Sequence, residues 1–298
     1  MKLIKKYSKI NLKLLIILLG PVFLSPIVAQ SKYDLQNIEI VPLKNELTSR
    51  DHELTISLPE SYNRSTDKKY PVLYFLDGYW HTSLLNSIKG LLRFDNVIPE
   101  VIMVGMSYQG KNVNYDSLRL LDLLPERMTT ADRVLESPFL AFIEESVIPY
   151  VESNYRVDSS ERALGGTSAG GLFTLFAMYQ NPDLFKRYIA ISPGVTWKNN
   201  SLLKIDEEYS KKIKKLPVRL FLSAGGDEYQ PFRDAIFNLQ KQIEKNNYQG
   251  LSLCNFVIKG ERHAGVCAEG YTRGLRWVFK DIAPTGPSGL TKIYEGGD

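Results

Sequence analysis

The sequence is poor in the residues that bind metals and form disulfides, with three histidines and two cysteines among 298 residues. Two cysteines do not form a metal site unless histidines complete it, and three histidines in the whole chain argue against metal chemistry. We therefore expect no metal and no other cofactor. Cys254 and Cys267 lie in the segments that flank His263. They either form a disulfide that braces this loop or stay unpaired, and the sequence leaves both possibilities open.

The sequence also lacks a basic excess outside its N-terminus. Five of its 37 lysines and arginines lie in residues 1–30, which contain no acidic residue, so the formal net charge of +4 comes from that segment. The rest of the chain is close to neutral and gives no basis for binding nucleic acid or an anionic membrane. Its hydrophobic content of 44% is typical of a globular protein with a substantial core.

Residues 1–30 have the order of segments that is typical of a secretory signal peptide. Lysines precede an apolar run from Leu14 to Leu24, and small residues follow at Val28-Ala29. The run is interrupted by Gly20-Pro21, and it is shorter than the roughly 20 apolar residues of a membrane span. We predict cleavage, a secreted or periplasmic protein, and no stable membrane association afterwards. A retained N-terminal anchor is the alternative.

Strand and helix patterns alternate along the rest of the chain. Alternating or continuously apolar runs predict strands over residues 54–58, 70–76, 101–106, 188–192, 218–224 and 251–258. Helical spacing predicts helices over residues 139–151, 235–246 and 270–279. Pro149 should kink or end the first of these helices, and residues 111–128 are predicted as a long polar loop. We expect one α/β domain over residues 32–283, with a mainly parallel central sheet and helices on both faces, and a mobile tail over 284–298.

The stretch Gly165–Gly171 contains Gly-x-Ser-x-Gly as Gly166, Ser168 and Gly170. Apolar residues suited to a buried strand precede it, and a helix-forming apolar run, 172–178, follows it. Strand, tight turn and helix is the context of a nucleophile elbow, whose central residue has a strained backbone and whose glycines avoid a collision across the turn. We interpret Ser168 as the nucleophile. A Gly/Ser-rich loop without chemistry is the alternative.

A serine nucleophile needs a base, and His263 is the candidate that the strand pattern favours. It follows the last predicted strand, and catalytic groups in such sheets gather at the carboxyl ends of the strands. His52 lies at the opposite end of an early strand, and His81 is a candidate pocket residue. The other reading of any of these histidines is a structural or surface residue.

The base in turn needs a carboxylate, and Asp227 and Glu228 follow the preceding strand. Neighbouring residues rarely face one partner together, so one of the two is expected in a solvated turn. The order serine, acid, histidine is the order of α/β-hydrolases.

A tetrahedral intermediate also needs two donors for its oxyanion. We expect the backbone N–H of Ala169 to be one of them and that of Tyr79, in the loop after Leu76, to be the other. Asp77 would then brace this turn without reacting. An ordinary Asp77-Gly78 turn is the alternative.

Five segments together resemble the putative esterase (esterase D-like) family of α/β-hydrolases: Tyr70–Gly78, Gly165–Gly171, Ile191–Pro193, Gly225–Glu228 and Gly260–His263. The resemblance covers about residues 45–282. That family includes siderophore, feruloyl and acetyl-xylan esterases. The resemblance implies an α/β-hydrolase fold and a serine esterase. It favours Glu228 over Asp227, because the family's acid comes three residues after the first glycine of its turn, and it matches Tyr79 and Ala169 to the oxyanion donors.

Within that family, Arg119-x-x-Asp122-x-x-Pro125 and the region around Phe139 resemble most the siderophore-esterase branch. The branch tends to have paired aromatic residues after Ser-Pro, whereas a single Trp197 stands here. The resemblance implies a serine carboxylesterase that acts through an acyl-enzyme on enterobactin-type esters, and the N-terminal segment adds the expectation that this enzyme is exported.

We expect the partner of this protein to be a small-molecule or oligosaccharide ester. Arg119, Trp80 and Trp197 are the candidate substrate-binding residues, because a guanidinium suits catecholate or carboxylate oxygens and indoles suit planar rings. A surface ion pair between Arg119 and Asp122 is the alternative for the arginine. Two other functions stay open: a feruloyl or acetyl-xylan esterase acting on plant polysaccharide, and a non-catalytic binding protein on the same scaffold.

Overall fold

The computed structural model describes residues 38–48, 50–110, 112–124, 137–286 and 288. The strands are β1 (Ile38–Leu43), β2 (His52–Ser57), β3 (Tyr70–Phe75), β4 (Ile102–Tyr108), β5 (Val157–Thr167), β6 (Arg187–Ile191), β7 (Arg219–Gly225) and β8 (Ser252–Ile258). The helices are α1 (Gly78–Phe94), α2 (Tyr115–Leu123), α3 (Pro138–Phe142), the π-helical η1 (Ile143–Val147), α4 (Ile148–Asn154), α5 (Ala169–Gln180), α6 (Trp197–Lys212), α7 (Gln230–Asn246), α8 (Val266–Val278) and the 3₁₀ turn η2 (Lys280–Ile282).

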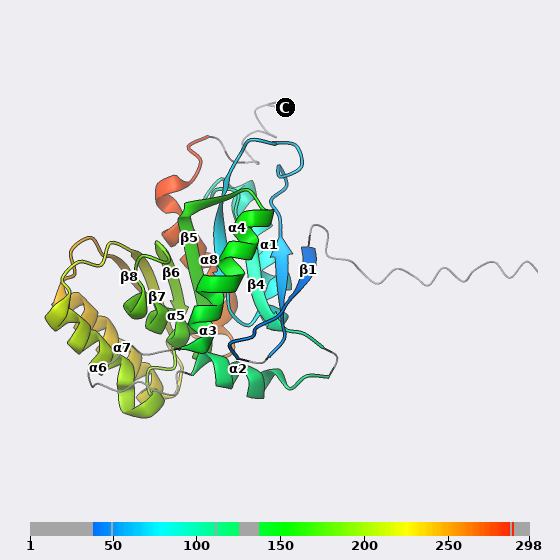
Figure 1. The fold of residues 1–298 in the computed structure, drawn as a ribbon. Coiled ribbons are helices and arrows are strands. Elements are labelled where there is room, and N and C mark those ends of the chain that lie inside the picture. The colour runs from blue at the N-terminus through cyan, green and yellow to red at the C-terminus, as the bar shows by residue number, and fades with distance from the viewer. Residues whose placement is uncertain (1–37, 49, 111, 125–136, 287, 289–298) are drawn as a thin grey trace, which may run out of the picture. The chain divides into compact units, whose positions relative to one another are not determined.

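The strands that the structure describes form one sheet in the order β1-β2-β4-β3-β5-β6-β7-β8. Strand β2 pairs antiparallel with both β1 and β4, and every pairing from β4 to β8 is parallel. Helices lie on both faces of this sheet (Figure 1). The predicted mainly parallel α/β architecture is therefore confirmed.

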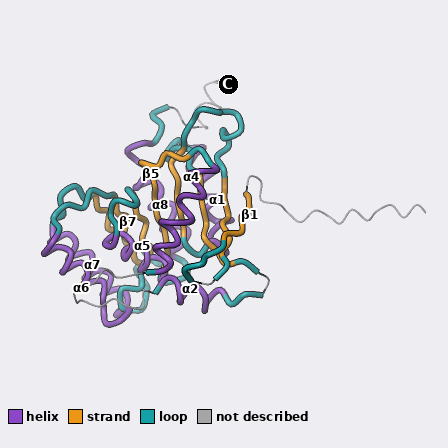
Figure 2. The backbone as a smooth tube through the Cα atoms, viewed as in Figure 1, coloured by secondary structure: helices purple, strands orange, loops and turns teal. Residues whose placement is uncertain are grey.

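Side chains of the central strands alternate between two separate hydrophobic cores. Tyr74 and Leu164 belong to the core that packs under α3, α4, α5 and α7, whereas Phe75 and Ala163 belong to the one under α1 and α8. This is the period of two that a strand imposes on its side chains. Helix α5 is buried almost all round, which explains its uniformly apolar sequence. The strands are the middle layer between these helices in Figure 2.

Each strand and helix expected from periodicity is present, with ends that shift by a few residues. Strand β1 and helices α1 and α6 were not expected. The predicted loop over residues 111–128 is wrong, because α2 lies within it. Asn114 caps the start of this helix, and its side chain accepts a hydrogen bond of 3.1 Å from the Ser117 N–H. The helix is only nine residues long, and the polar residues around it concealed it.

The helical run that begins at Pro138 does not end at Pro149. It continues to Asn154 through the π-helical turn η1, in which the Ile148 N–H donates to the Ile143 carbonyl five residues back. A proline lacks an N–H and its ring collides with the carbonyl four residues earlier in a regular α-helix. A wider turn just before Pro149 removes that collision, so helical structure continues past the proline.

The predicted signal peptide, residues 1–30, lies outside the described residues, and so does most of the predicted tail over 284–298. Both boundaries stay predictions. Over the part of the chain that the structure describes, none of the helices combines the length and apolar character needed to cross a bilayer.

Candidate active site

Ser168 occupies a sharp turn between β5 and α5. Its backbone has φ 55° and ψ −116°, a conformation that a residue with a side chain rarely adopts. Its N–H donates to the Ile191 carbonyl on the neighbouring strand at 3.0 Å. A Cβ at Gly166 would lie 2.4 Å from the backbone of Gly170, so glycine is required there. The elbow expected from Gly-x-Ser-x-Gly is present, and it presents Ser168 at the carboxyl end of β5.

Ala169 is the first residue of α5, directly after Ser168. The first N–H groups of an α-helix have no partner within the helix, and the helix dipole favours negative charge at this end. Gly170 and Gly171 follow, and a Cβ at Gly171 would lie 3.0 Å from both the Ile191 carbonyl oxygen and the Cα of Pro193. The crowding shows how closely the start of α5 packs against the end of β6.

A chain of hydrogen bonds links Ser168, His263 and Glu228. The Nε2 of His263 lies 2.9 Å from the Ser168 Oγ, and its Nδ1 lies 2.6 Å from the Glu228 Oε1. The ring of Phe232 contacts the imidazole edge-on, with 5.0 Å between ring centroids. The His263 side chain is 48% exposed and that of Glu228 only 1%. The carboxylate is thus enclosed behind an imidazole that remains open to a ligand.

Glu228 accepts hydrogen bonds on both of its oxygens. The Gly225 N–H donates to Oε2 at 2.8 Å, and the Ser192 hydroxyl and His263 both contact Oε1. Burial raises the pKa of the Glu228 carboxyl, but these hydrogen bonds outweigh burial and hold the pKa below its usual 4.5. Asp227 is exposed beside it. The structure therefore directs Glu228, and not Asp227, towards His263.

Ser192 is a site residue that sequence reasoning did not single out. It is fully buried, its backbone is in the left-handed region at φ 45°, and its hydroxyl also lies 3.5 Å from the His263 Nδ1. The available signal was its place in the Ile191–Pro193 motif, directly after a strand of the parallel sheet. The Ser192 hydroxyl thus donates to one oxygen of the Glu228 carboxylate, and the Gly225 N–H donates to the other.

The turn that carries Tyr79 lies against the elbow. A Cβ at Gly170 would lie 3.2 Å from the Asp77 carboxylate and 3.3 Å from the Leu76 side chain. Tyr79 is the second residue of α1, so its N–H, like that of Ala169, belongs to a helix start without intrahelical partners. The two expected oxyanion donors thus come from two helix N-termini that pack against each other.

The guanidinium of Arg119 binds Asp77. Its Nε and Nη2 each lie 2.7 Å from one oxygen of that carboxylate, and its Cζ lies 5.4 Å from the centre of the Trp80 ring. The alternative ion pair with Asp122 is not the one that forms, because Asp122 binds Arg50, His52 and Tyr108. Arg119 therefore contacts the turn Asp77–Trp80, which we name the oxyanion turn after the expected role of Tyr79.

The predicted aromatic residues are partly open to solvent. The side chains of Tyr79, Trp80 and Trp197 are exposed, and Tyr79 stacks on Tyr115 of α2 with 3.9 Å between ring centroids. Trp197 is the first residue of α6, and its N–H donates to the carbonyl of Gly194. The N–H of Gly194 in turn donates to the carbonyl of Ser168. One short segment thus ties Trp197 to the elbow.

Comparison with known proteins identifies the family. The model of the family described as "Putative esterase" matches residues 45–250, which is more than half of the chain. The chain belongs to this family. It is a carboxylic ester hydrolase with the α/β-hydrolase fold.

Several relatives of this esterase carry specific names. The chain is 27% identical over 279 residues to the ferri-bacillibactin esterase BesA of Bacillus subtilis, covering 86% of this chain and 93% of that protein. It is 29% identical over 209 residues to a siderophore enterobactin esterase of Emericella nidulans, covering 62% and 68%. An IroE-like serine hydrolase from Shewanella oneidensis superposes with a TM-score of 0.71 at 26% identity, covering 83% of this chain and 81% of that one.

Replacing Ser192 by alanine is expected to lower the free energy of unfolding of the esterase by about 1.5–3 kcal/mol at pH 7, because a hydrogen bond to a buried charge is lost. The native pKa of Glu228 lies below the ordinary 4.5, so this stabilisation is complete above that pH and declines as the pH falls through the native pKa. The difference in free energy of unfolding between the wild type and the Ser192→Ala variant should therefore be smaller at acidic pH. Urea denaturation at pH 7 and at pH 3.5 measures it.

Ser223 provides the matched control for this variant. It is equally buried on the adjacent β7, and among the described residues its hydroxyl has no hydrogen-bond partner. Ser223→Ala should leave stability almost unchanged at both pH values. An equal loss in both variants would contradict a specific role for the Ser192 hydroxyl.

Both cysteines of the esterase are free thiols, Cys254 on β8 and Cys267 on α8. Of the two possibilities that the sequence left open, the structure has the unpaired one. Burial raises the pKa of both thiols, to about 12 for Cys267, so neither is a ready nucleophile. Within the described ranges, no group of three or more histidine, cysteine, aspartate or glutamate side chains is arranged to hold a metal ion.

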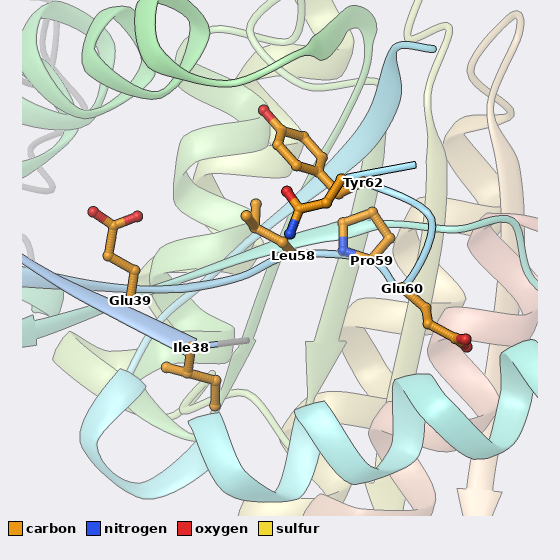
Figure 3. A pocket seen from close by; sticks show the side chains of 7 residues that line it. Ile38, Glu39, Leu58, Pro59, Glu60 and Tyr62 are labelled. Atoms are coloured by element: carbon orange, nitrogen blue, oxygen red, sulfur yellow. The ribbon is translucent and has the colours of Figure 1, made fainter. Parts of the chain in front are cut away.

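A shallow pocket of about 190 Å³ lies at the β1 edge of the esterase, lined by Ile38, Glu39, Leu58, Pro59, Glu60, Tyr62 and Asn63 (Figure 3). The end of β2 that leads into it, Ser57, pairs with Met103 at the beginning of β4. Ser168, in contrast, follows the end of β5. The pocket therefore lies near the end of the sheet at which the parallel strands begin. The hydrogen-bonded chain of Ser168, His263 and Glu228 lies at the end at which those strands finish.

Proposed function

We propose that this protein is an exported serine esterase in which Ser168, His263 and Glu228 form the catalytic triad. The observation that carries the proposal is the unbroken chain of hydrogen bonds from the Ser168 hydroxyl through both imidazole nitrogens to the buried carboxylate. The Nδ1–H of His263 donates to Glu228, which leaves Nε2 free to accept the serine proton.

The reaction proceeds through an acyl-enzyme. The Ser168 Oγ attacks the ester carbonyl as His263 takes its proton, and the carbonyl oxygen becomes an oxyanion held by the N–H groups of Tyr79 and Ala169. The intermediate collapses as His263 gives the proton to the departing alcohol. Water, activated by His263, then attacks the acyl-enzyme and releases the acid. No cofactor takes part in these steps.

We propose a siderophore ester of the enterobactin type as the substrate. The named relatives act on ferri-bacillibactin and on enterobactin, as their names state. The exposed rings of Trp80 and Trp197 suit the planar groups of such esters. The lysine-rich, apolar N-terminus supports export to the periplasm or the medium. The names of the relatives support a small-molecule ester as the partner, and the near-neutral remainder of the chain gives no basis for binding nucleic acid or an anionic membrane.

A parallel rate screen tests the substrate. With enterobactin, methyl ferulate, acetylated xylan and p-nitrophenyl acetate, we expect kcat/KM for enterobactin to exceed the others by about 10²-fold, because binding energy from its remote groups is used at the reacting carbonyl. Methyl ferulate or acetylated xylan as the best substrate would instead support the feruloyl or acetyl-xylan esterase. An absence of fluorophosphonate labelling at Ser168 would support a non-catalytic binding protein.

A further inference from the structure

Arg119 contacts residues on both sides of Tyr79 in the oxyanion turn. Its fork binds the carboxylate of Asp77 through two parallel hydrogen bonds, and its face lies over the ring of Trp80. The side chain is only 13% exposed and that of Asp77 only 4%. A planar guanidinium that is fixed by its edge and by its face has little freedom, so it holds the segment between these two contacts as well.

Asp77 needs such a partner, because its backbone is strained. It has φ 57° and ψ 43°, the left-handed region, which a residue other than glycine adopts at a cost of about 1–3 kcal/mol unless the surroundings enforce it. It precedes α1, yet its side chain does not cap that helix. The carboxylate points instead to Arg119. A Cβ at Gly78 would lie 2.9 Å from the backbone of Gly105, so the turn is also pressed against β4.

Helix α2, which carries Arg119, is itself anchored to the sheet. Asp122, three residues further on, is completely buried and accepts hydrogen bonds from His52 at 3.1 Å and from Tyr108 at 2.8 Å, and it also pairs with Arg50. Residues three apart lie on one face of a helix. One face of α2 thus binds β2 and β4 through Asp122 and the oxyanion turn through Arg119.

We propose that Arg119 is a positioning residue that sets the Tyr79 N–H in place for the oxyanion, through Asp77, and that α2 is the support that fixes it. This inference rests on the proposed function. It differs from the expectation of a substrate contact, because two nitrogens of the guanidinium, Nε and Nη2, already donate to Asp77. The N–H of a residue next to a strained turn shifts when its brace is lost, and loss of one oxyanion donor costs about 10²–10³-fold in kcat.

The test uses Arg119→Lys and a neutral ester, p-nitrophenyl acetate, which has no anionic group for an arginine to bind. Lysine keeps the charge and loses the fork. We expect kcat to fall about 10²-fold with KM nearly unchanged, since both acylation and deacylation pass through an oxyanion. A trifluoromethyl ketone, whose carbonyl carbon bonds to the Ser168 Oγ as its oxygen becomes an oxyanion, should lose affinity by a similar factor.

Arg162→Lys is the matched control. Arg162 lies within β5, its side chain is 20% exposed, and it binds Glu152 at 2.6 Å. This variant should keep the wild-type kcat and the wild-type inhibitor affinity. Asp77→Asn removes the same pair from the other side and should reproduce the Arg119→Lys effect. The double variant should be no worse than either single one. If one of the single variants fails to fold, the other single variant still tests the pair.

Two results would overturn the positioning role of Arg119, and they differ in whether the proposed esterase function also fails. If Arg119→Lys keeps kcat and inhibitor affinity on neutral ligands but raises KM for enterobactin, Arg119 is a substrate contact and the positioning role is refuted. If wild-type turnover of p-nitrophenyl acetate does not depend on Ser168, the proposed function fails, and the inference fails with it.

Discussion

Replacing Ser168 by alanine is expected to lower ester turnover by roughly 10⁶-fold, the loss seen when a triad serine is removed. Without the hydroxyl there is no acyl-enzyme, and His263 has no proton to take. The hydroxyl makes its hydrogen bond only to His263 among the described residues. Alanine also tolerates φ 55° about as poorly as serine does, so the elbow should keep its conformation.

Two measurements check this prediction. Steady-state kinetics on p-nitrophenyl acetate should show the loss, with a residual rate of about 10³–10⁴-fold over water from the oxyanion donors and binding. Fluorophosphonate labelling should disappear, while the thermal midpoint stays near that of the wild type. A variant that retains a rate within tenfold of the wild type would refute Ser168 as the nucleophile.

The second large effect is expected at Glu228. Its replacement by glutamine should lower kcat by about 10⁴-fold, as is known for a triad acid changed to its amide. Three donors aim at the two carboxylate oxygens: the Ser192 hydroxyl, the Gly225 N–H and the His263 Nδ1. A glutamine has a single acceptor oxygen, so its NH₂ group would face at least one of these donors. The imidazole would then lose its orienting partner and its tautomer.

Asp227→Asn is the matched comparison one residue away. Asp227 is exposed, and its backbone N–H donates to the Glu261 carbonyl at 3.0 Å, a contact that the substitution does not touch. We expect a change of no more than a few fold in kcat. Single-turnover rates for the two variants, measured in parallel, decide between the residues. A larger loss in Asp227→Asn than in Glu228→Gln would transfer the acid role to Asp227.

Hydrophobic periodicity and the spacing of glycines along the sequence predicted most of the parallel sheet and the elbow at Ser168. A buried strand such as Tyr70–Phe75 is recognisable because both of its faces are covered and its side chains are almost all apolar. The elbow is recognisable because Gly166 and Gly170 leave room that only glycine permits. The same rules failed for α2, a helix of only nine residues within a polar segment, and for α6, whose sequence is polar and has little periodicity. These helices are stabilised by contacts with distant parts of the chain, such as Asp122 with His52 and Asp206 with Tyr248.

By itself, the amino-acid order determined the fold class, the elbow serine and the positions of the candidate base and acid, because each depends on residues that are neighbours along the chain. Only the tertiary structure brought Ser192 to the carboxylate and paired Arg119 with Asp77 instead of Asp122. It also turned Glu228, which the resemblance had favoured over Asp227, towards His263. These contacts join residues 35 to 42 positions apart. Which partner a side chain meets at such separations depends on how the strands and helices pack, and no local pattern encodes it.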